Sequence, residues 1–316
     1  MTRLRAAVIG CGHFGRYHAQ KYAALPGVDL VAVVDHGRAS ADAFAAEFGA
    51  AALLDPQELI GRVDVASVTT PTAVHHAIAR PLLDAGIHLL IEKPISRTVE
   101  EAADLVASAR ARGVVLQIGH LERFNPALLA LTDVLDAPLF IEVDRLAPFK
   151  PRGTDVAVTL DLMIHDLDLI LQLVKSPLER LDAVGAPVLS GEDDIVNARL
   201  QFATGCVANV TASRISLKSE RKIRVFQRDA YLSIDLMERE VLIARRGRGE
   251  MFPGIPDVTT EHRKFEANDA LLLEIEAFLG SVRGERPVAV SGEDGLRALD
   301  LALRIQREMR RPPPTG

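Results

Sequence analysis

The chain has 316 residues, a formal net charge of −6 and 48% hydrophobic residues. A chain of this length can bury a sizeable core in one large or two ordinary domains. The negative charge gives no electrostatic reason to expect binding to nucleic acid or to an anionic membrane. Its apolar runs are far shorter than the roughly 20 residues of a membrane span.

The N-terminus leads directly into a strand pattern and carries no signal-peptide pattern. The chain has only two cysteines, Cys11 and Cys206, which cannot form a disulfide framework. The sequence therefore predicts a cytoplasmic protein.

A glycine motif follows the first apolar run, with the spacing G-x-G-x-x-G. Gly10 permits a tight turn, Gly12 lets a pyrophosphate approach the backbone, and Gly15 lets the next helix pack closely on the sheet. A second apolar run ends in Asp35, where a carboxylate would bind the ribose hydroxyls of a dinucleotide. Its charge would repel a 2′-phosphate, which favours NAD over NADP, although basic residues at positions 36 and 38 could offset the repulsion. The alternative is an ordinary β-turn-α corner that binds nothing.

Strand and helix patterns alternate through residues 1–119, which predicts a parallel, doubly wound sheet of the Rossmann type. Expected strands lie at 6–9, 30–34, 63–68, 88–91 and 114–118, and expected helices at 16–25, 39–48, 75–85 and 98–112. A capping-box pattern predicts a short helix start at 55–58.

The pattern changes in residues 120–316, which we expect to form an α+β domain with a mostly antiparallel, open-faced sheet. This domain would bind the substrate and form oligomer contacts. Its expected strands are 138–146 and a run within 178–244 that includes 196–202, 207–213, 221–227, 231–236 and 241–244. Its expected helices are 126–135, 159–174, 268–282 and 295–310. Residues 245–262, rich in glycine, proline and arginine, predict a mobile excursion.

Several polar residues and glycines follow the predicted parallel strands, at the edge where open α/β sheets bind ligands. We expect the cofactor there. The predicted cofactor-binding residues are Gly10, Gly12, His13, Phe14, Gly15, Asp35, Thr69, Thr70, Pro71, His75, Glu92 and Lys93. His76 and His88 are expected to be surface or packing residues. The same role is the alternative for His75, which is close to the Thr69–Pro71 loop.

Lys93 follows an apolar strand and precedes Pro94, a bond that can be cis. In this position we expect its side chain near the nicotinamide end of a cofactor. The alternative is a solvated lysine at a strand end.

Asp161 and His165 are four residues apart in a strongly apolar predicted helix and therefore share one face. An imidazole with a pKa near 6.5 is a suitable proton acceptor at neutral pH. The alternatives are a satisfied core His–Asp pair, or a metal site that also uses Asp168. No Cys/His cluster supplies further ligands, so we expect no metal.

The glycine motif, the Thr69-Thr70-Pro71 turn, Glu92-Lys93-Pro94 and Asp161-x-x-x-His165 together resemble the glucose–fructose oxidoreductase/inositol dehydrogenase (Gfo/Idh/MocA) family over nearly the whole chain. The resemblance implies an NAD(P)-dependent sugar dehydrogenase with Lys93, Asp161 and His165 as catalytic residues. It also implies a homodimer or homotetramer that forms through the C-terminal sheet.

Residues 119–126 and 163–170 further resemble the branch that oxidises the 3-hydroxyl of UDP-N-acetylglucosamine, on the route to 3-amino sugars and lipid A. The substrate-binding residues that this implies are Lys93, His120, Arg123, Asn125, Asp161 and His165. Dehydrogenases of inositol or UDP-N-acetylglucosaminuronate share the scaffold. The same motifs are also compatible with the reduction of a different small molecule, or with a non-catalytic regulator that binds a dinucleotide.

Overall fold

The structure, a computed structural model, describes residues 3–131, 134–150 and 156–310. Contacts between Cα atoms divide the chain into two compact units. The first comprises Met1–Leu121 and Asp269–Leu299, and the second comprises Glu122–Asn268 and Asp300–Gly316. The predicted boundary lies close to the first crossing, but the sequence patterns did not indicate that residues 269–299 return to the first unit.

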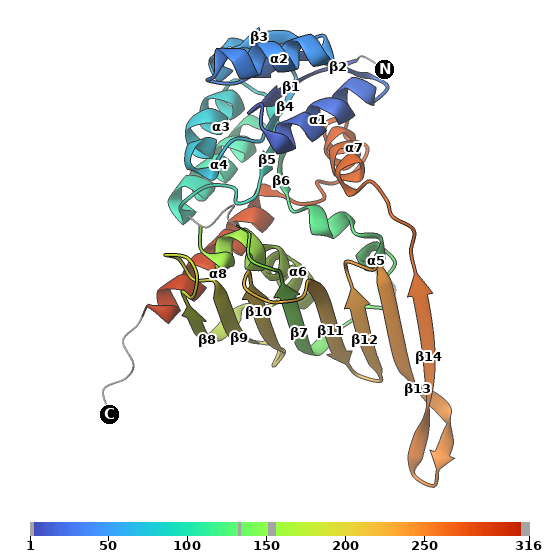
Figure 1. The fold of residues 1–316 in the computed structure, drawn as a ribbon. Coiled ribbons are helices and arrows are strands. Elements are labelled where there is room, and N and C mark those ends of the chain that lie inside the picture. Colours follow the sequence, from blue (N-terminus) through green and yellow to red (C-terminus); the bar gives the residue numbers. More distant parts are fainter. Residues whose placement is uncertain (1–2, 132–133, 151–155, 311–316) are drawn as a thin grey trace. The chain divides into compact units, whose positions relative to one another are not determined.

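A six-stranded parallel sheet forms the centre of the first unit, in the order β3-β2-β1-β4-β5-β6 (Figure 1). The strands β1, β2 and β3 follow one another toward one edge of the sheet, and β4, β5 and β6 follow one another toward the other edge. The strand order therefore switches between β1 and β4, as it does in Rossmann folds. The strands are β1 (Leu4–Ile9), β2 (Val28–Val34), β3 (Ala51–Leu53), β4 (Val65–Val68), β5 (His88–Glu92) and β6 (Leu116–Gly119). The predicted doubly wound parallel sheet is confirmed.

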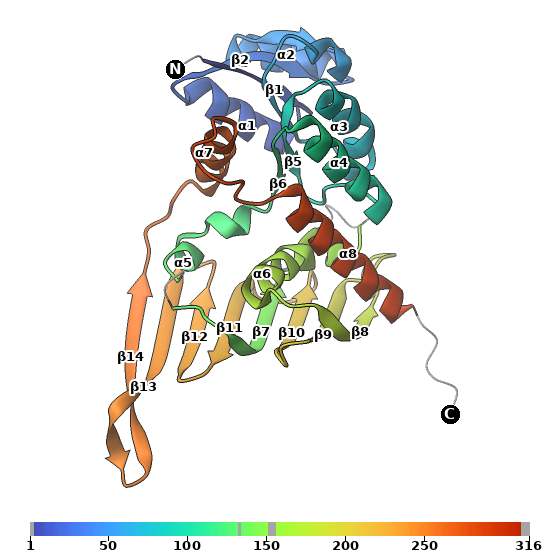
Figure 2. The same ribbon diagram turned by 180° about the vertical axis from the view of Figure 1, so that it is seen from behind.

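Helices cover both faces of this sheet (Figure 2). On one face, α1 packs against α7 around a core that includes Tyr22, Leu90 and Phe278. α3 and α4 pack together on the other face. The helical segments of this unit are α1 (His13–Ala24), α2 (Arg38–Phe48), η1 (Pro56–Leu59), η2 (Thr72–Val74), α3 (His75–Asp84), α4 (Val99–Arg112), α7 (Ala270–Val282) and the start of α8 (Gly292–Met309).

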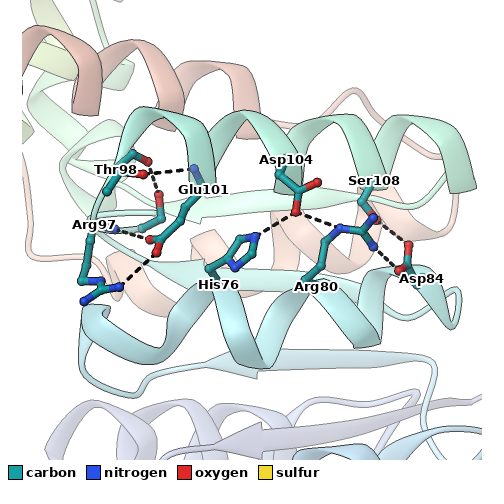
Figure 3. A network of polar contacts seen from close by, with 9 residues as sticks. His76, Arg80, Asp84, Arg97, Thr98, Glu101, Asp104 and Ser108 are labelled. Atoms are coloured by element: carbon teal, nitrogen blue, oxygen red, sulfur yellow. Dashed lines mark hydrogen bonds and ion pairs between the residues drawn. The ribbon is translucent and has the colours of Figure 1, made fainter.

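Polar contacts join α3 to α4 on the surface (Figure 3). Asp104 of α4 accepts hydrogen bonds from His76 Nε2 at 2.8 Å and from Arg80 Nε at 2.9 Å. Ser108 donates to Asp84 at 3.0 Å. The side chains of His76, Arg80 and Asp104 are partly exposed, so each of their ion pairs contributes at most about 1 kcal/mol. Ser108 is buried. His76 lies on the surface, as the sequence predicted.

An eight-stranded mixed sheet forms the second unit, in the order β14-β13-β12-β11-β7-β10-β9-β8. Neighbouring strands run antiparallel except β7 and β10, which are parallel. The strands are β7 (Pro138–Leu146), β8 (Leu178–Ala186), β9 (Ile195–Phe202), β10 (Val207–Ser213), β11 (Glu220–Gln227), β12 (Ala230–Asp235), β13 (Glu240–Phe252) and β14 (Ile255–Lys264). The predicted mostly antiparallel sheet is confirmed.

One face of this sheet is covered by α6 (Ile164–Val174), which follows a π-helical turn, η4 (Thr159–Met163). Alternate apolar residues of the strands, such as Ile141, Val210 and Ile223, are buried on this face. None of the described helices is long and apolar enough to cross a membrane.

Two predictions for this unit are wrong. The segment predicted as a mobile excursion belongs to the β13–β14 hairpin, whose register shifts between Arg246 and Phe252 and in which Gly254 supplies a positive φ of 78° at the turn. The helix expected at 126–135 is the short α5 (Pro126–Leu129), which the Asn125 side chain caps by accepting a hydrogen bond from Ala127 N. Residues 132–133, within that prediction, lie outside the described residues.

Candidate active site

The glycine loop lies between β1 and α1, beside the loop that follows β4. Gly10 has φ +103°, and a Cβ there would lie 2.9 Å from the carbonyl carbon of Thr69. A Cβ on Gly15 would overlap the carbonyl oxygen of Gly10. At Gly12, the N-cap residue of α1, a Cβ would meet nothing within 4 Å. Two glycines therefore permit close packing and the third keeps space open at a helix N-terminus, where backbone amides favour an anion.

Asp35 connects the end of β2 to this loop. Its carboxylate accepts hydrogen bonds from Cys11 N at 2.9 Å and from Gly37 N at 2.8 Å. A carboxylate has about four acceptor positions, so these bonds leave capacity for ribose hydroxyls. Burial and the Asp35 charge raise the pKa of the Cys11 thiol to about 12. The loop cysteine is therefore a neutral thiol near pH 7.

A cavity of about 610 Å³ opens at this end of the sheet. Six of the predicted cofactor residues line it, namely Gly10, Gly12, Asp35, Thr69, Thr70 and Pro71. Sequence reasoning missed the rest of its wall, which includes Leu54, Pro56, Val74, Ala77 and Ile78. Their apolar side chains suit a flat aromatic ring such as adenine. The backbone amides at the N-terminus of α1, the open space at Gly12 and the size of the cavity fit a dinucleotide.

His75 is fully buried and lies between two loops of the first unit. Its Nε2 lies 2.8 Å from the carbonyl oxygen of Thr70, and its Nδ1 lies 3.0 Å from that of Pro94. Burial lowers the pKa of His75. These contacts support the packing alternative, because His75 connects the Thr69–Pro71 loop to the Lys93–Pro94 segment.

The other predicted cofactor residues lie around this site without lining the cavity. His13 and Phe14 are exposed at the start of α1, and their rings contact each other. Glu92 ends β5 and receives a hydrogen bond from a buried histidine. Lys93, partly buried, follows it, and the Lys93–Pro94 bond is cis, as the sequence allowed.

In the second unit, Asp161 lies in the π-helical turn and His165 in the first turn of α6. Both side chains are partly exposed. π-Helical turns are rare and are frequent at functional sites. Together η4 and α6 span residues 159–174, so the helix predicted there is confirmed. The sequence pattern did not reveal the π turn at its start.

Two buried ion pairs hold the carboxylates that follow His165. Arg145 of β7 donates from Nε and Nη2 to Asp166, both at 2.7 Å, and from Nη1 to Glu122 at 3.0 Å. Arg123 donates from Nε and Nη2 to Asp168 at 2.7 and 2.5 Å. Sequence reasoning missed Arg145 and Glu122, because no local pattern indicates pairing between such distant residues.

The structure gives structural partners to two of the predicted substrate-binding residues. Arg123 holds Asp168, and Asn125 donates to the carbonyl oxygen of Leu236 at 3.0 Å while it caps α5. His120 is buried directly after β6. Direct contact of these three residues with a substrate stays a prediction. Within the described residues, no group of three or more His, Cys, Asp or Glu side chains could hold a metal ion.

Comparisons with known proteins agree with both units. Residues 4–120 match the family described as oxidoreductase family, NAD-binding Rossmann fold, and residues 145–233 match the GFO/IDH/MocA C-terminal domain. UDP-N-acetylglucosamine 3-dehydrogenase of Acidithiobacillus ferrooxidans is 41% identical over 97% of this chain and 97% of the relative.

A solved structure of UDP-N-acetylglucosamine 3-dehydrogenase from Acidithiobacillus ferrooxidans covers 98% of this chain and 100% of its own, with a TM-score of 0.91 and 40% identity. The scyllo-inositol 2-dehydrogenase (NAD(+)) of Bacillus subtilis is 25% identical over 98% of this chain and 94% of the relative. With its NAD-binding glycine loop, its two matching domains and these relatives, the chain belongs to the Gfo/Idh/MocA family of oxidoreductases.

Proposed function

We propose that this protein oxidises the 3-hydroxyl of UDP-N-acetylglucosamine to a ketone with NAD. The observation that carries the proposal is the 41% identity, over nearly the whole chain, to a relative named for that activity. The chain contains Lys93, Asp161 and His165, residues suited to the proton transfers of alcohol oxidation.

Bound NAD would accept the hydride from the sugar carbon. His165 would take the hydroxyl proton, because an imidazole pKa near 6.5 is close to the working pH. Asp161, on the preceding turn, would orient the imidazole or the hydroxyl. The Lys93 ammonium would donate a hydrogen bond to the reacting oxygen and stabilise the negative charge that develops there.

Arg123 and Asn125 would act on the nucleotide sugar from the second unit. A guanidinium suits phosphate oxygens, but the hydrogen bonds of Arg123 to Asp168 support a second role, in which the arginine fixes α6 through that carboxylate. His120, buried after β6, would complete the substrate-binding set.

The test is a substrate screen of the purified protein with NAD. We expect UDP-N-acetylglucosamine to produce NADH absorbance and a product two hydrogen atoms lighter than the substrate. Matched reactions contain UDP-glucose, UDP-N-acetylglucosaminuronate, and myo- and scyllo-inositol. Preferred turnover of an inositol or of the uronate would contradict the proposed substrate. Tight NADH binding without turnover of any sugar would favour a non-catalytic regulator.

Asp35 is expected to make the enzyme prefer NAD over NADP. Two like charges about 4 Å apart repel by roughly 4 kcal/mol at an effective dielectric constant near 20, and a partly open site leaves about 1–3 kcal/mol of this. Asp35→Asn keeps an acceptor oxygen but removes the charge. We therefore expect the ratio of kcat/KM values for NAD and NADP to fall by about 5- to 150-fold.

The matched control is Asp29→Asn, which removes an exposed carboxylate of β2 that pairs with Arg3. This variant should leave the cofactor ratio unchanged. If the wild-type enzyme used NADP as well as NAD, His36 and Arg38 would offset the charge of Asp35, and the prediction would fail.

The second unit is expected to form a closed dimer or tetramer through β9–β12, between residues 196 and 236. The sheet face opposite the buried side chains carries Phe226, whose ring contacts Phe140 at 5.6 Å and Tyr231 at 5.0 Å between centroids. Exposed aromatic clusters are common in protein interfaces. We expect Phe226→Glu to shift the light-scattering mass toward the monomer.

Leu217→Glu is the control, because Leu217 is fully exposed between β10 and β11. A wild-type protein that is monomeric at micromolar concentration would contradict the assembly.

The two free cysteines favour a reducing, cytoplasmic location.

A further inference from the structure

A chain of buried hydrogen bonds crosses the interior of the first unit, on the face that α1 covers. Tyr22 Oη lies 2.8 Å from Ser67 Oγ, and Ser67 Oγ lies 3.0 Å from His18 Nδ1. His18 Nε2 lies 3.2 Å from Glu92 Oε1. Tyr22, Ser67 and His18 are fully buried, and the Glu92 side chain is 16% exposed.

One direction of hydrogen bonding satisfies every donor in this chain. Tyr22 donates to Ser67, Ser67 donates to Nδ1 of a neutral His18, and His18 Nε2–H donates to Glu92. In the reverse direction the Tyr22 hydroxyl would need another acceptor. The donor arrangement therefore favours an ionised Glu92 as the end of the chain.

A second carboxyl group, that of Glu274 in α7, lies in the same interior. Glu274 is 0% exposed, and neither of its carboxyl oxygens has a hydrogen-bond partner among the described residues. Its position is fixed through its backbone, because Gln117 Nε2 donates to the Glu274 carbonyl oxygen at 3.0 Å. An ionised carboxylate without a partner is far more costly to bury than a neutral acid.

The titratable groups that face Glu274 come from two elements. Glu92 of β5 opposes a negative charge on Glu274, and α1 contributes Tyr22. β6 contributes the uncharged Gln117. Burial, and then the charge of Glu92, raise the pKa of Glu274 well above its ordinary value.

We propose that Glu274 is a proton-carrying positioning residue. Glu92 and Glu274 hold one proton between them, which resides on Glu274, so that the single negative charge of this interior stays on Glu92 beside His18. The proposal concerns the first unit alone and does not depend on which substrate the enzyme oxidises.

The Glu92 carboxylate holds the end of β5, and with it the adjacent Lys93, in place. A Cβ on Gly119 would lie 3.1 Å from the Glu92 carboxyl atoms, so the carboxylate packs against the end of β6. It also holds α1 through His18. Glu92 directly precedes Lys93, and a second charge on Glu274 would repel the Glu92 carboxylate from this position.

The first test compares unfolding of the wild type and Glu274→Gln over pH 5–9. In the folded state Glu274 keeps its proton, whereas in the unfolded state it ionises near its ordinary pKa of about 4.3. Unfolding therefore releases one proton, and the stabilising effect is lost as pH rises toward the folded-state pKa. We expect the wild-type unfolding constant, relative to that of Glu274→Gln, to rise about tenfold per pH unit.

Glu276→Gln is the matched control, since Glu276 is exposed on the same helix. The wild-type unfolding constant relative to that of Glu276→Gln should stay constant with pH. A constant ratio for Glu274→Gln as well would show that Glu274 is ionised in the folded protein, and would overturn the proposal.

The second test asks whether Glu92 shares the proton. The same comparison is made between Glu92→Gln and the double variant Glu92→Gln/Glu274→Gln. The opposing charge is gone in both, so the tenfold rise per pH unit in the ratio of their unfolding constants should end at a lower pH than it does with Glu92 present. An unchanged pH range would overturn the shared-proton arrangement.

Infrared spectroscopy provides a measurement that does not require Glu274→Gln to fold. At pH 8 the wild type should show the C=O stretching band of a buried protonated carboxylic acid, and D₂O exchange should shift it. Glu274→Asp should move the band, and Glu276→Gln should not. A spectrum without such a band would contradict the proposal.

Discussion

His165→Ala is expected to lower kcat by about 10²–10⁴-fold, the usual contribution of a general base. Imidazole is the side-chain group whose ordinary pKa is nearest to neutral pH. Lys93→Ala should have a comparable effect, because the ammonium would stabilise the developing alkoxide. Turnover of the nucleotide sugar, followed by NADH absorbance, measures both effects.

NADH affinity separates a catalytic effect from a structural one. Neither residue lies in the glycine loop, so both variants should bind NADH with near-normal affinity in a fluorescence titration. His262→Ala is the control, because His262 is an exposed histidine of β14 in the same unit as His165. Near-normal kcat in a folded His165→Ala variant would place the proton acceptor elsewhere.

Local sequence rules predicted the first unit well. The glycine spacing at residues 10–15 requires a tight turn and a close helix contact, and the structure shows both. The capping box at Asp55 likewise predicts η1, in which the Asp55 side chain accepts from Gln57 N at 2.9 Å. Each of these features depends on neighbours within a few residues, so the sequence alone could show it.

Long-range pairing explains what the sequence patterns missed. Gly247 and Gly249 indicated a loop, but in the β13–β14 hairpin they lie against the Asp257 side chain, which accepts from Gly249 N at 3.0 Å. A Cβ on Gly247 would overlap that carboxylate. The glycines therefore accommodate a cross-strand partner, and the partner cannot be recognised before the strands are paired.

The buried polar networks were missed for the same reason. His18 lies in a helix pattern that marks which face is buried, but its partners Ser67 and Glu92 come from two other strands. The sequence pattern offered Asp168 only as an alternative metal ligand and gave Asp166 no role, whereas the structure pairs each with a buried arginine from elsewhere in the chain.

The largest expected effect on stability comes from Arg145→Met. The Arg145 side chain is 4% exposed and bridges Asp166, which is 1% exposed, to Glu122. A methionine fills a similar volume but leaves the buried carboxylate of Asp166 without its hydrogen-bonded cation, while Glu122 keeps only Arg221. Removing one partner of a buried pair costs about 3–5 kcal/mol of unfolding free energy, which urea denaturation followed by circular dichroism can measure.

Arg221→Met is a closely matched control, because Arg221 Nη1 donates to the same Glu122 oxygen at the same 3.0 Å, but its side chain is 50% exposed. An exposed pair contributes less than about 1 kcal/mol. Because Arg145 also holds Asp166, the difference between the two variants measures the buried Arg145–Asp166 pair together with the burial of the bond to Glu122. Equal costs for both would show that burial of Arg145 does not govern the stability of this network.

The deficit of Arg145→Met should also depend on pH, with a sign that follows from the carboxylates. Without the arginine, burial raises the pKa of Asp166 further in the folded state, because the Arg145 charge that opposes this effect is gone. The variant therefore gains protons on folding, and its deficit relative to the wild type should shrink as pH falls toward the usual carboxylate range near pH 4. Arg221→Met should show little such change. A deficit that stays constant between pH 8 and pH 5 would mean that lost packing, rather than unpaired buried charge, is the cause.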